Sequence, residues 1–116
     1  MNKYELKENK ILVSEGVAET IINQLGGSKF RAITGARDFV KGKEKGNDLV
    51  QFALPANFAK NGINKVKIVL TKKDLYDITF YKIRGTNVKV IATETGVYAD
   101  MMGKIFTSVT GLDIRL

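Results

Sequence analysis

The sequence predicts an α+β domain in which an antiparallel sheet of about five strands packs on an N-terminal and a C-terminal helix. Two periodicities carry this prediction, because apolar residues recur at helical spacing near each end of the chain and alternate with polar residues between Lys65 and Thr93. Short connections between the strands predict hairpins, since a parallel crossover needs roughly a dozen residues or more. A run of strands flanked by helices favours a sheet with one covered face.

The first element expected is an amphipathic helix over residues 15–25, with Ser14 as its N-cap and two glycines as its stop. Residues 1–13 are polar and predict a lead-in to a single domain over residues 14–116. A chain of this length buries enough apolar surface to fold without a metal or a disulfide. No internal repeat or linker is visible.

From Lys29 the period changes to two, which predicts a bent strand that Gly35 interrupts and that resumes at Asp38. The lysine- and glycine-rich stretch KGKEKGN, residues 41–47, is expected to be a loop. A further strand follows, and Pro55, the only proline, closes it.

Residues 55–64 are expected to form a loop, followed by strands over 65–71, 76–82 and 87–93 and by a helix that Gly111 ends. The alternation in these strands directs the following side chains inward: Val66, Ile68, Leu70, Tyr76, Ile78, Phe80, Val88, Val90 and Ala92. The expected core between sheet and helices contains Ile21, Leu25, Ile68, Leu70, Ile78, Phe80, Val90, Ile105, Phe106 and Val109.

The chain contains no cysteine and no histidine, so disulfides, thiolate catalysis and histidine-based acid–base catalysis are excluded. A protein that is not an enzyme and uses no cofactor or metal is therefore expected. Four carboxylates near strand ends have no recognised metal spacing: Asp74, Asp77, Glu94 and Asp100. We interpret Asp74 as a turn residue and Asp100 as a complement to the dipole of the last helix.

Positive charge dominates, with 19 Lys and Arg against 12 Asp and Glu and a net charge of +7, which favours a polyanionic partner. Weak nucleic-acid binding is expected through a basic sheet face with one aromatic, built from Lys29, Arg31, Lys65, Lys67, Tyr81, Lys82 and Lys89. The KGKEKGN loop adds Lys41, Lys43 and Lys45. It lacks the serine or threonine of a nucleotide-binding loop. Lysines on a solvent-facing sheet that serve only solubility are the alternative.

A second hypothesis is a protein-binding modulator or a self-associating structural protein. Phe58 and Ile63 are apolar residues in an otherwise polar loop, where a binding anchor is found in many interfaces. The alternative for both is that they pack under the loop against the core. The N-terminus lacks the apolar run of a signal peptide and no later segment is apolar enough to span a bilayer, which predicts a cytoplasmic protein without a membrane partner.

Three pieces of sequence resemble a recurrent group of small uncharacterised proteins encoded by bacteriophages and other mobile elements. They are NQLGG leading into the TGA turn, the strand KIVL followed by DLYD, and the closing segment from Phe106 to Leu112. The resemblance covers nearly the whole chain after residue 14. It implies an accessory protein of a phage or mobile element in a bacterial host, which binds host or element components, and it carries over no catalytic residue.

Overall fold

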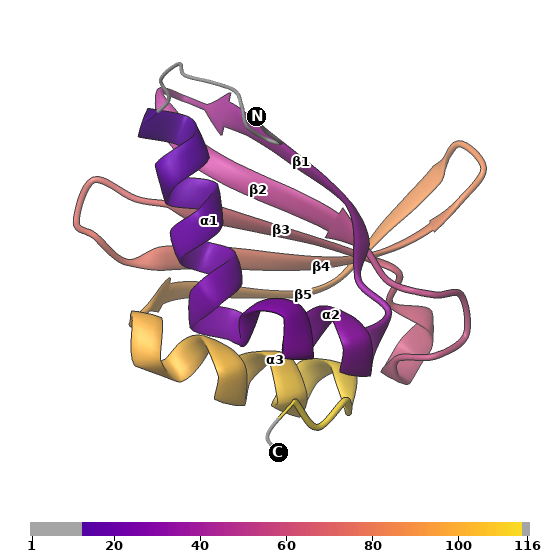
Figure 1. Ribbon diagram of the computed structural model, residues 1–116. Coiled ribbons are helices and arrows are strands. Elements are labelled where there is room, and N and C mark those ends of the chain that lie inside the picture. Colours follow the sequence, from indigo (N-terminus) through magenta and orange to yellow (C-terminus); the bar gives the residue numbers. More distant parts are fainter. Residues whose placement is uncertain (1–12, 115–116) are drawn as a thin grey trace.

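The computed structural model describes residues 13–114, with an antiparallel sheet that carries helices on one face (Figure 1). The helices are α1 (Val13–Leu25), α2 (Gly27–Thr34) and α3 (Met102–Thr110), with short 3-10 helices η1 (Lys60–Gly62) and η2 (Ala99–Met101). The strands are β1 (Arg37–Glu44), β2 (Asn47–Ala53), β3 (Lys65–Leu70), β4 (Tyr76–Arg84) and β5 (Asn87–Val97). Each strand pairs antiparallel with the next along the chain. The predicted α+β class is confirmed.

The core lies between the sheet and the three helices, and a cluster of aromatic rings occupies its centre. The rings belong to Phe30, Phe39, Phe52, Phe80 and Phe106. Most of the predicted core is confirmed, since the following residues are buried in it: Ile21, Leu25, Ile68, Ile78, Phe80 and Phe106. Leu70, Ile105 and Val109 pack against it and are partly buried. Val90 is the exception and is exposed.

The first part of the bent strand predicted from Lys29 is wrong, because this segment is the helix α2, whereas the resumption at Asp38 is confirmed by β1. Gly26 has φ 131° and Gly27 has φ 63°, so the two glycines turn the chain after α1 and a second helix starts at once. Phe30 and Thr34 are the buried residues of α2 and lie four positions apart, on one face of the helix.

Helix α2 ends at a threonine that makes two hydrogen bonds although it is fully buried. The hydroxyl of Thr34 donates to the carbonyl of Phe30 at 2.7 Å and accepts from the N–H of Ala36 at 3.1 Å. Gly35 follows with φ 72°, and its N–H donates to the carbonyl of Arg31 at 2.9 Å. A left-handed glycine of this kind is a common end of a helix.

Helix α3 ends in the same way. The hydroxyl of Thr110 donates to the carbonyl of Phe106 at 2.7 Å and accepts from the N–H of Leu112 at 3.2 Å. Gly111 has φ 77°, and its N–H donates to the carbonyl of Thr107 at 2.8 Å. The pattern F-x-x-x-T-G therefore occurs at residues 30–35 and again at 106–111, a local repeat that sequence inspection missed.

The stretch KGKEKGN is mostly strand and not loop. Lys41 and Lys43 lie in β1, Asn47 begins β2, and only Lys45 and Gly46 form the turn. Both turn residues have positive φ, 53° and 81°, as the favoured two-residue hairpin turn requires.

Helix α1 begins at Val13, two residues before the expected start, so Ser14 lies in its first turn and is not an N-cap. The expected polar lead-in, apart from Val13, falls outside the described residues. Strand β5 runs to Val97, four residues further than predicted. In the described part of the chain, no helix has the length and apolar character needed to cross a membrane.

Candidate functional site

The β4–β5 hairpin extends beyond the rest of the sheet and projects from the molecule (Figure 1). Strand β3 begins at Lys65, which pairs with Tyr81, so the strand residues of segment 82–89 pair only with each other. Every residue from Arg84 to Val90 is exposed. The two strands thus form a free ribbon with solvent on both faces.

The side chain of Asn64 holds the base of this ribbon. Its Nδ2 donates to the carbonyl of Ile83 at 2.9 Å, and its Oδ1 accepts from the N–H of Ile83 at 2.8 Å. The backbone N–H of Asn64 donates to the carbonyl of Tyr81 at 2.9 Å. The amide group therefore makes the two hydrogen bonds that the backbone of a neighbouring strand residue makes elsewhere in the sheet.

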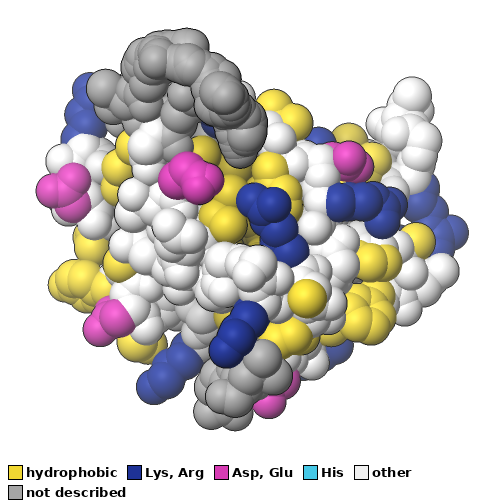
Figure 2. Space-filling model, in the orientation of Figure 1, with side chains coloured by type: hydrophobic (Ala, Val, Ile, Leu, Met, Phe, Trp, Pro, Cys, Tyr) yellow, Lys and Arg dark blue, Asp and Glu magenta, His cyan; other side chains and the backbone are white. Residues whose placement is uncertain are grey.

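One face of the ribbon is cationic. Lys82 pairs with Lys89 and Arg84 pairs with Asn87, and residues directly opposite in an antiparallel pair share a face. These four side chains line a cleft of 150 Å³. None of the three cations forms an ion pair with a residue that the structure describes. The cleft thus concentrates three positive charges and one amide, a composition that suits an anion; Figure 2 shows Lys and Arg side chains near the base of the projecting hairpin.

The stem of Lys82 packs against the loop before β3. Gly62 has φ 73°, and a Cβ built on it lies 3.0 Å from both Cδ and Cε of Lys82. A side chain at position 62 therefore displaces the lysine. The absence of one lets the end of the Lys82 side chain, from Cδ to Nζ, lie beside the backbone of Gly62.

The opposite face of the ribbon is apolar. Ile83 pairs with Val88 and Tyr81 pairs with Val90, and the two valines are 57% and 55% exposed. The prediction that these valines point into the core is wrong. A register shift between Phe80 and Tyr81 inserts one extra residue in β5, and this β-bulge turns both valines to the face opposite the helices.

The predicted basic sheet face is not formed as expected. Lys82 follows buried Phe80 by two positions, so it points to the helix side of the sheet, and Lys89 pairs with it. Lys65 and Lys67 alternate with buried residues and point to the open face. The expectation that these four lysines share an outward face is therefore wrong.

On the open face, Lys67 is already engaged. Its Nζ contacts Oε1 of Glu44 at 2.6 Å, and this hydrogen bond raises the pKa of Lys67 above its ordinary value, although burial acts in the opposite direction. A hydrogen bond to the side chain of Tyr81 adds to the upward shift. Lys65 pairs with Tyr81 directly and forms no ion pair with a described carboxylate.

The other predicted cations lie elsewhere. Lys29 and Arg31 are on α2 and not on a strand, and the guanidinium of Arg31 lies 4.8 Å from the centre of the Phe39 ring. This distance is within the range of a cation–π contact. The prediction that Lys29 and Arg31 belong to the sheet face is therefore wrong.

Lys41 and Lys43 lie on the helix side of the edge strand β1, because they pair with Val50 and Asp48. The Nζ of Lys43 contacts Oδ1 of Asp48 at 2.8 Å, and Lys41 also has an interaction partner. Lys45 is in the exposed turn. Of the predicted nucleic-acid residues, Lys82 and Lys89 line this cleft together.

Arg84 and Asn87 line this cleft as well, and the sequence analysis did not select them. The signal was present in the alternation, since Arg84 is two residues after Lys82 and Asn87 two residues before Lys89. The expected strands over 76–82 and 87–93 leave Arg84 in the connection, and Asn87 carries no charge.

The two apolar residues of the loop over 55–64 differ in their exposure to solvent. Phe58 is 52% exposed, as a binding anchor needs to be, whereas Ile63 is fully buried and belongs to the core. Ile63 is therefore not part of a surface. The alternative expected for both residues, packing under the loop against the core, is found for Ile63 and not for Phe58.

Three of the carboxylates near strand ends lie in turns or bind the backbone. Asp74 has φ 61° in the turn between β3 and β4, and Oδ1 of Asp77 accepts the N–H of Gly96 at 3.0 Å. Asp100 lies in the first turn of η2. Within residues 13–114, no three acidic side chains gather as a metal site.

Comparison of the chain with protein-family models, with curated proteins and with solved structures finds no significant match. The fold and the cationic ribbon therefore carry the functional inference by themselves.

Proposed function

We propose that the protein binds nucleic acid weakly, without catalysis, through the cationic face of the β4–β5 ribbon. The observation that supports it is the Lys82–Lys89 pair, in which two like charges lie directly opposite each other on a projecting hairpin. Like charges in this position destabilise a sheet. A phosphate backbone placed over the cleft neutralises both lysines and Arg84 together.

The arrangement differs from that of an ordinary soluble surface. Lys43 and Lys67, elsewhere on the sheet, each have a carboxylate partner within 2.8 Å, whereas the three ribbon cations have none among the described residues. Because these three cations line one cleft and have no carboxylate partner among the described residues, we infer that their role is to bind an anion and not only to keep the protein soluble.

The resemblance to small proteins of phages and mobile elements is consistent with this function. Such a protein acts in the cytoplasm of a bacterial host, where it meets the nucleic acid of the element or of the host. The chain has neither cysteine nor histidine, which is compatible with that compartment and with a binding role.

Fluorescence anisotropy with labelled oligonucleotides at low and at physiological salt tests the proposal. We expect binding that weakens with salt, because counterions are released from the phosphates, and a log–log slope that falls by about one for each ribbon lysine removed. The variant carries Lys82→Ala and Lys89→Ala. Absence of binding at low salt, or binding that ignores salt, contradicts the proposal.

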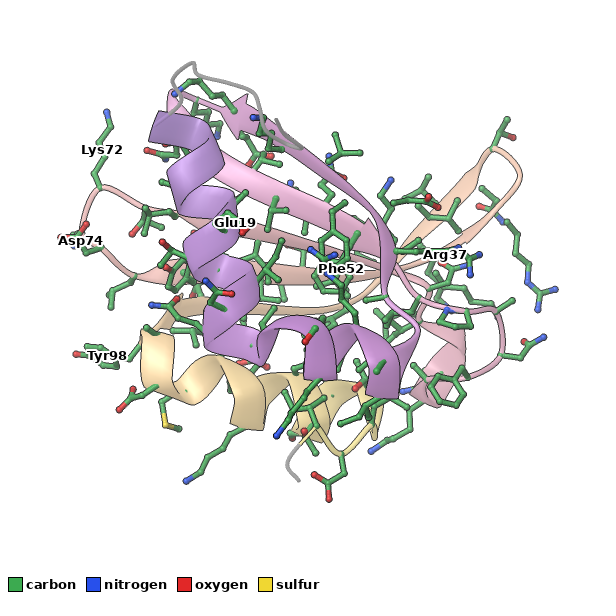
Figure 3. The ribbon with its side chains drawn as sticks, in the orientation of Figure 1. Glu19, Arg37, Phe52, Lys72, Asp74 and Tyr98 are labelled. Carbon is green, nitrogen blue, oxygen red and sulfur yellow. The ribbon has the colours of Figure 1, made fainter. Side chains whose placement is uncertain are left out.

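The matched control carries Lys72→Ala and Lys73→Ala, which lowers the net charge by the same two units. Both residues are exposed in the turn between β3 and β4. Figure 3 places Lys72 at the end of the sheet opposite the ribbon. Equal loss of affinity in the two double variants indicates attraction by net charge alone and removes the ribbon as the site.

A second candidate function is self-association or binding of another protein, which the exposed side chain of Phe58 favours. A large aromatic residue that is half exposed in a loop resembles the anchors found at the centre of interfaces. Sedimentation at increasing protein concentration, with Phe58→Ala for comparison, tests self-association. A sedimentation coefficient that is constant with concentration and equal in both proteins excludes it.

A further inference from the structure

We infer, resting on the proposed nucleic-acid binding, that the ribbon enters the major groove of double-stranded DNA. The ribbon consists of two antiparallel strands with backbones about 4.8 Å apart, and the side chains on its two faces make it wider than this spacing. The major groove of B-DNA is about 12 Å wide and admits a two-stranded ribbon, whereas the minor groove is only about 6 Å wide. The partner is thus identified by the width of its groove.

The free length of the ribbon matches the depth of that groove. Strand β3 stops opposite Tyr81, and three further residues lead to Arg84 at the turn. Three residues of strand span about 10 Å, and the major groove is about 8.5 Å deep. Residues 84–90 are exposed, whereas Lys82 and Ile83 are partly buried at the base, so the outer part of the ribbon is open to the groove.

The order of side chains along the ribbon fits an entry with the turn first. Arg84 and Asn87 are the pair nearest the turn, and they carry the groups that hydrogen-bond the major-groove edges of guanine and adenine. Lys82 and Lys89 lie one step back, where the phosphates at the rim of the groove pass. The four side chains thus divide into a lysine pair near the rim and a base-reading pair, Arg84 and Asn87, at the tip.

The apolar face of the ribbon is also accommodated in this groove. Val88 and Val90 are more than half exposed and contact no protein core. The methyl group of thymine is displayed in the major groove and receives apolar contacts there. A single strand or an A-form RNA duplex does not offer this surface, because the major groove of A-form RNA is too deep and narrow for side chains to read.

The test compares four ligands of one sequence by anisotropy at low salt: duplex DNA, duplex RNA, single-stranded DNA, and duplex DNA whose cytosines carry a glucosylated hydroxymethyl group. The sugar fills the major groove and leaves the phosphates unchanged. We expect unmodified duplex DNA to bind at least about tenfold more tightly than the other three. A variant with Arg84→Ala and Asn87→Ala is expected to lose this preference and to keep a salt-dependent residual affinity.

The outcomes separate this inference from the function on which it rests. Equal affinity for glucosylated and unmodified DNA, with salt dependence intact, overturns groove entry and leaves phosphate binding in place. Tighter binding of the single strand or of RNA also overturns it. No binding of any of the four ligands at low salt contradicts the proposed function itself.

Discussion

The rings of Phe30 and Phe106 meet edge to face in the core, with their centroids 5.1 Å apart and an interplanar angle of 68°. Each ring lies four residues before a buried threonine whose hydroxyl donates to the carbonyl of that phenylalanine. The last turns of α2 and α3 are therefore built in the same way and contact each other through the same position. In each helix, the phenylalanine that makes the ring contact is thus also the residue whose carbonyl accepts the hydrogen bond of the buried threonine.

We expect Thr34→Val and Thr110→Val each to lower the free energy of unfolding by about 1–2 kcal/mol. Valine has nearly the same shape, but it leaves the N–H two residues later without its hydroxyl partner. Urea unfolding followed by circular dichroism measures the change. Thr20→Val is the control, because the hydroxyl of Thr20 makes the same type of bond to the carbonyl of Gly16 but is exposed. If Thr20→Val lowers the free energy of unfolding as much as the two buried variants do, burial of the threonine has no role.

Replacement of Gly35 by alanine is expected to destabilise the protein more than replacement of Gly46. Both have positive φ, 72° and 81°, so both substitutions carry a backbone cost of about 1 kcal/mol. A Cβ on Gly35 additionally lies 2.7 Å from Cγ of Pro55, whereas Gly46 has open space around it. Thermal unfolding of the two variants measures the difference, and equal midpoints show that contact with the proline ring is of no consequence.

Phe106→Ala is expected to cost about 3–5 kcal/mol, a large part of a total stability of about 5–15 kcal/mol. Phe106 is 2% exposed and contacts three other rings. Phe58→Ala is the control, because Phe58 is 52% exposed and its loss is expected to change stability by less than about 0.5 kcal/mol. For the same reason, a chain that stops at Tyr98 and so lacks α3 is expected to be unfolded. Cooperative unfolding of that shortened chain at the original midpoint contradicts the packing described here.

Lys89→Glu is expected to stabilise the folded state by about 0.2–1 kcal/mol and to abolish nucleic-acid binding. It converts the like-charge pair with Lys82 into an opposite-charge pair. Lys72→Glu makes the same change of charge in an exposed turn. We expect it to leave stability within about 0.5 kcal/mol of the original and to weaken binding less. A Lys89→Glu variant that is less stable than the original protein contradicts the interpretation of this pair.

Stability is expected to fall as pH rises above about 10. The pKa of Lys67 is raised in the folded state by Glu44, so its stabilisation is complete below the unfolded-state pKa and is lost as pH rises through the folded one. The pKa of Tyr76 is raised chiefly by burial and also by Asp74, and its ionisation acts in the same direction. Urea unfolding between pH 7 and 11 measures the loss. Glu44→Gln removes the contribution of Lys67 and leaves that of Tyr76, so this variant is expected to lose less stability between pH 7 and 11. A loss equal to that of the original protein excludes a role for the Lys67–Glu44 pair.

The sequence predicted the central strands well because Val66, Ile68, Ile78 and Phe80 alternate with polar residues and are covered by helices on one side only. It failed around Phe30 and Thr34, for a geometric reason. A spacing of four residues places two side chains on one face of a helix and also on one face of a strand, so it does not distinguish the two. Packing against the core selects the helix over the strand for this segment, and the sequence does not show that packing.

The candidate site was predicted only in part. Lys82 and Lys89 were selected for their charge, but their shared face depends on a bulge beside Phe80 that nothing in the apolar run VKVIA reveals. Their partners Arg84 and Asn87 were missed because strand β4 was expected to end at residue 82. The length of the free ribbon depends on where β3 begins to pair, which is a tertiary property.

The simple strand order also bears on how quickly the chain reaches its native state. Every strand pairs with its neighbour in sequence, so the five-stranded meander closes no loop longer than the connection over residues 54–64. The contact between the Phe30 and Phe106 rings, in contrast, joins segments near opposite ends of the described chain. We therefore expect hairpins to form first and the docking of α3 beside α2 to complete folding, so that substitutions at Phe106 accelerate unfolding more than they slow folding.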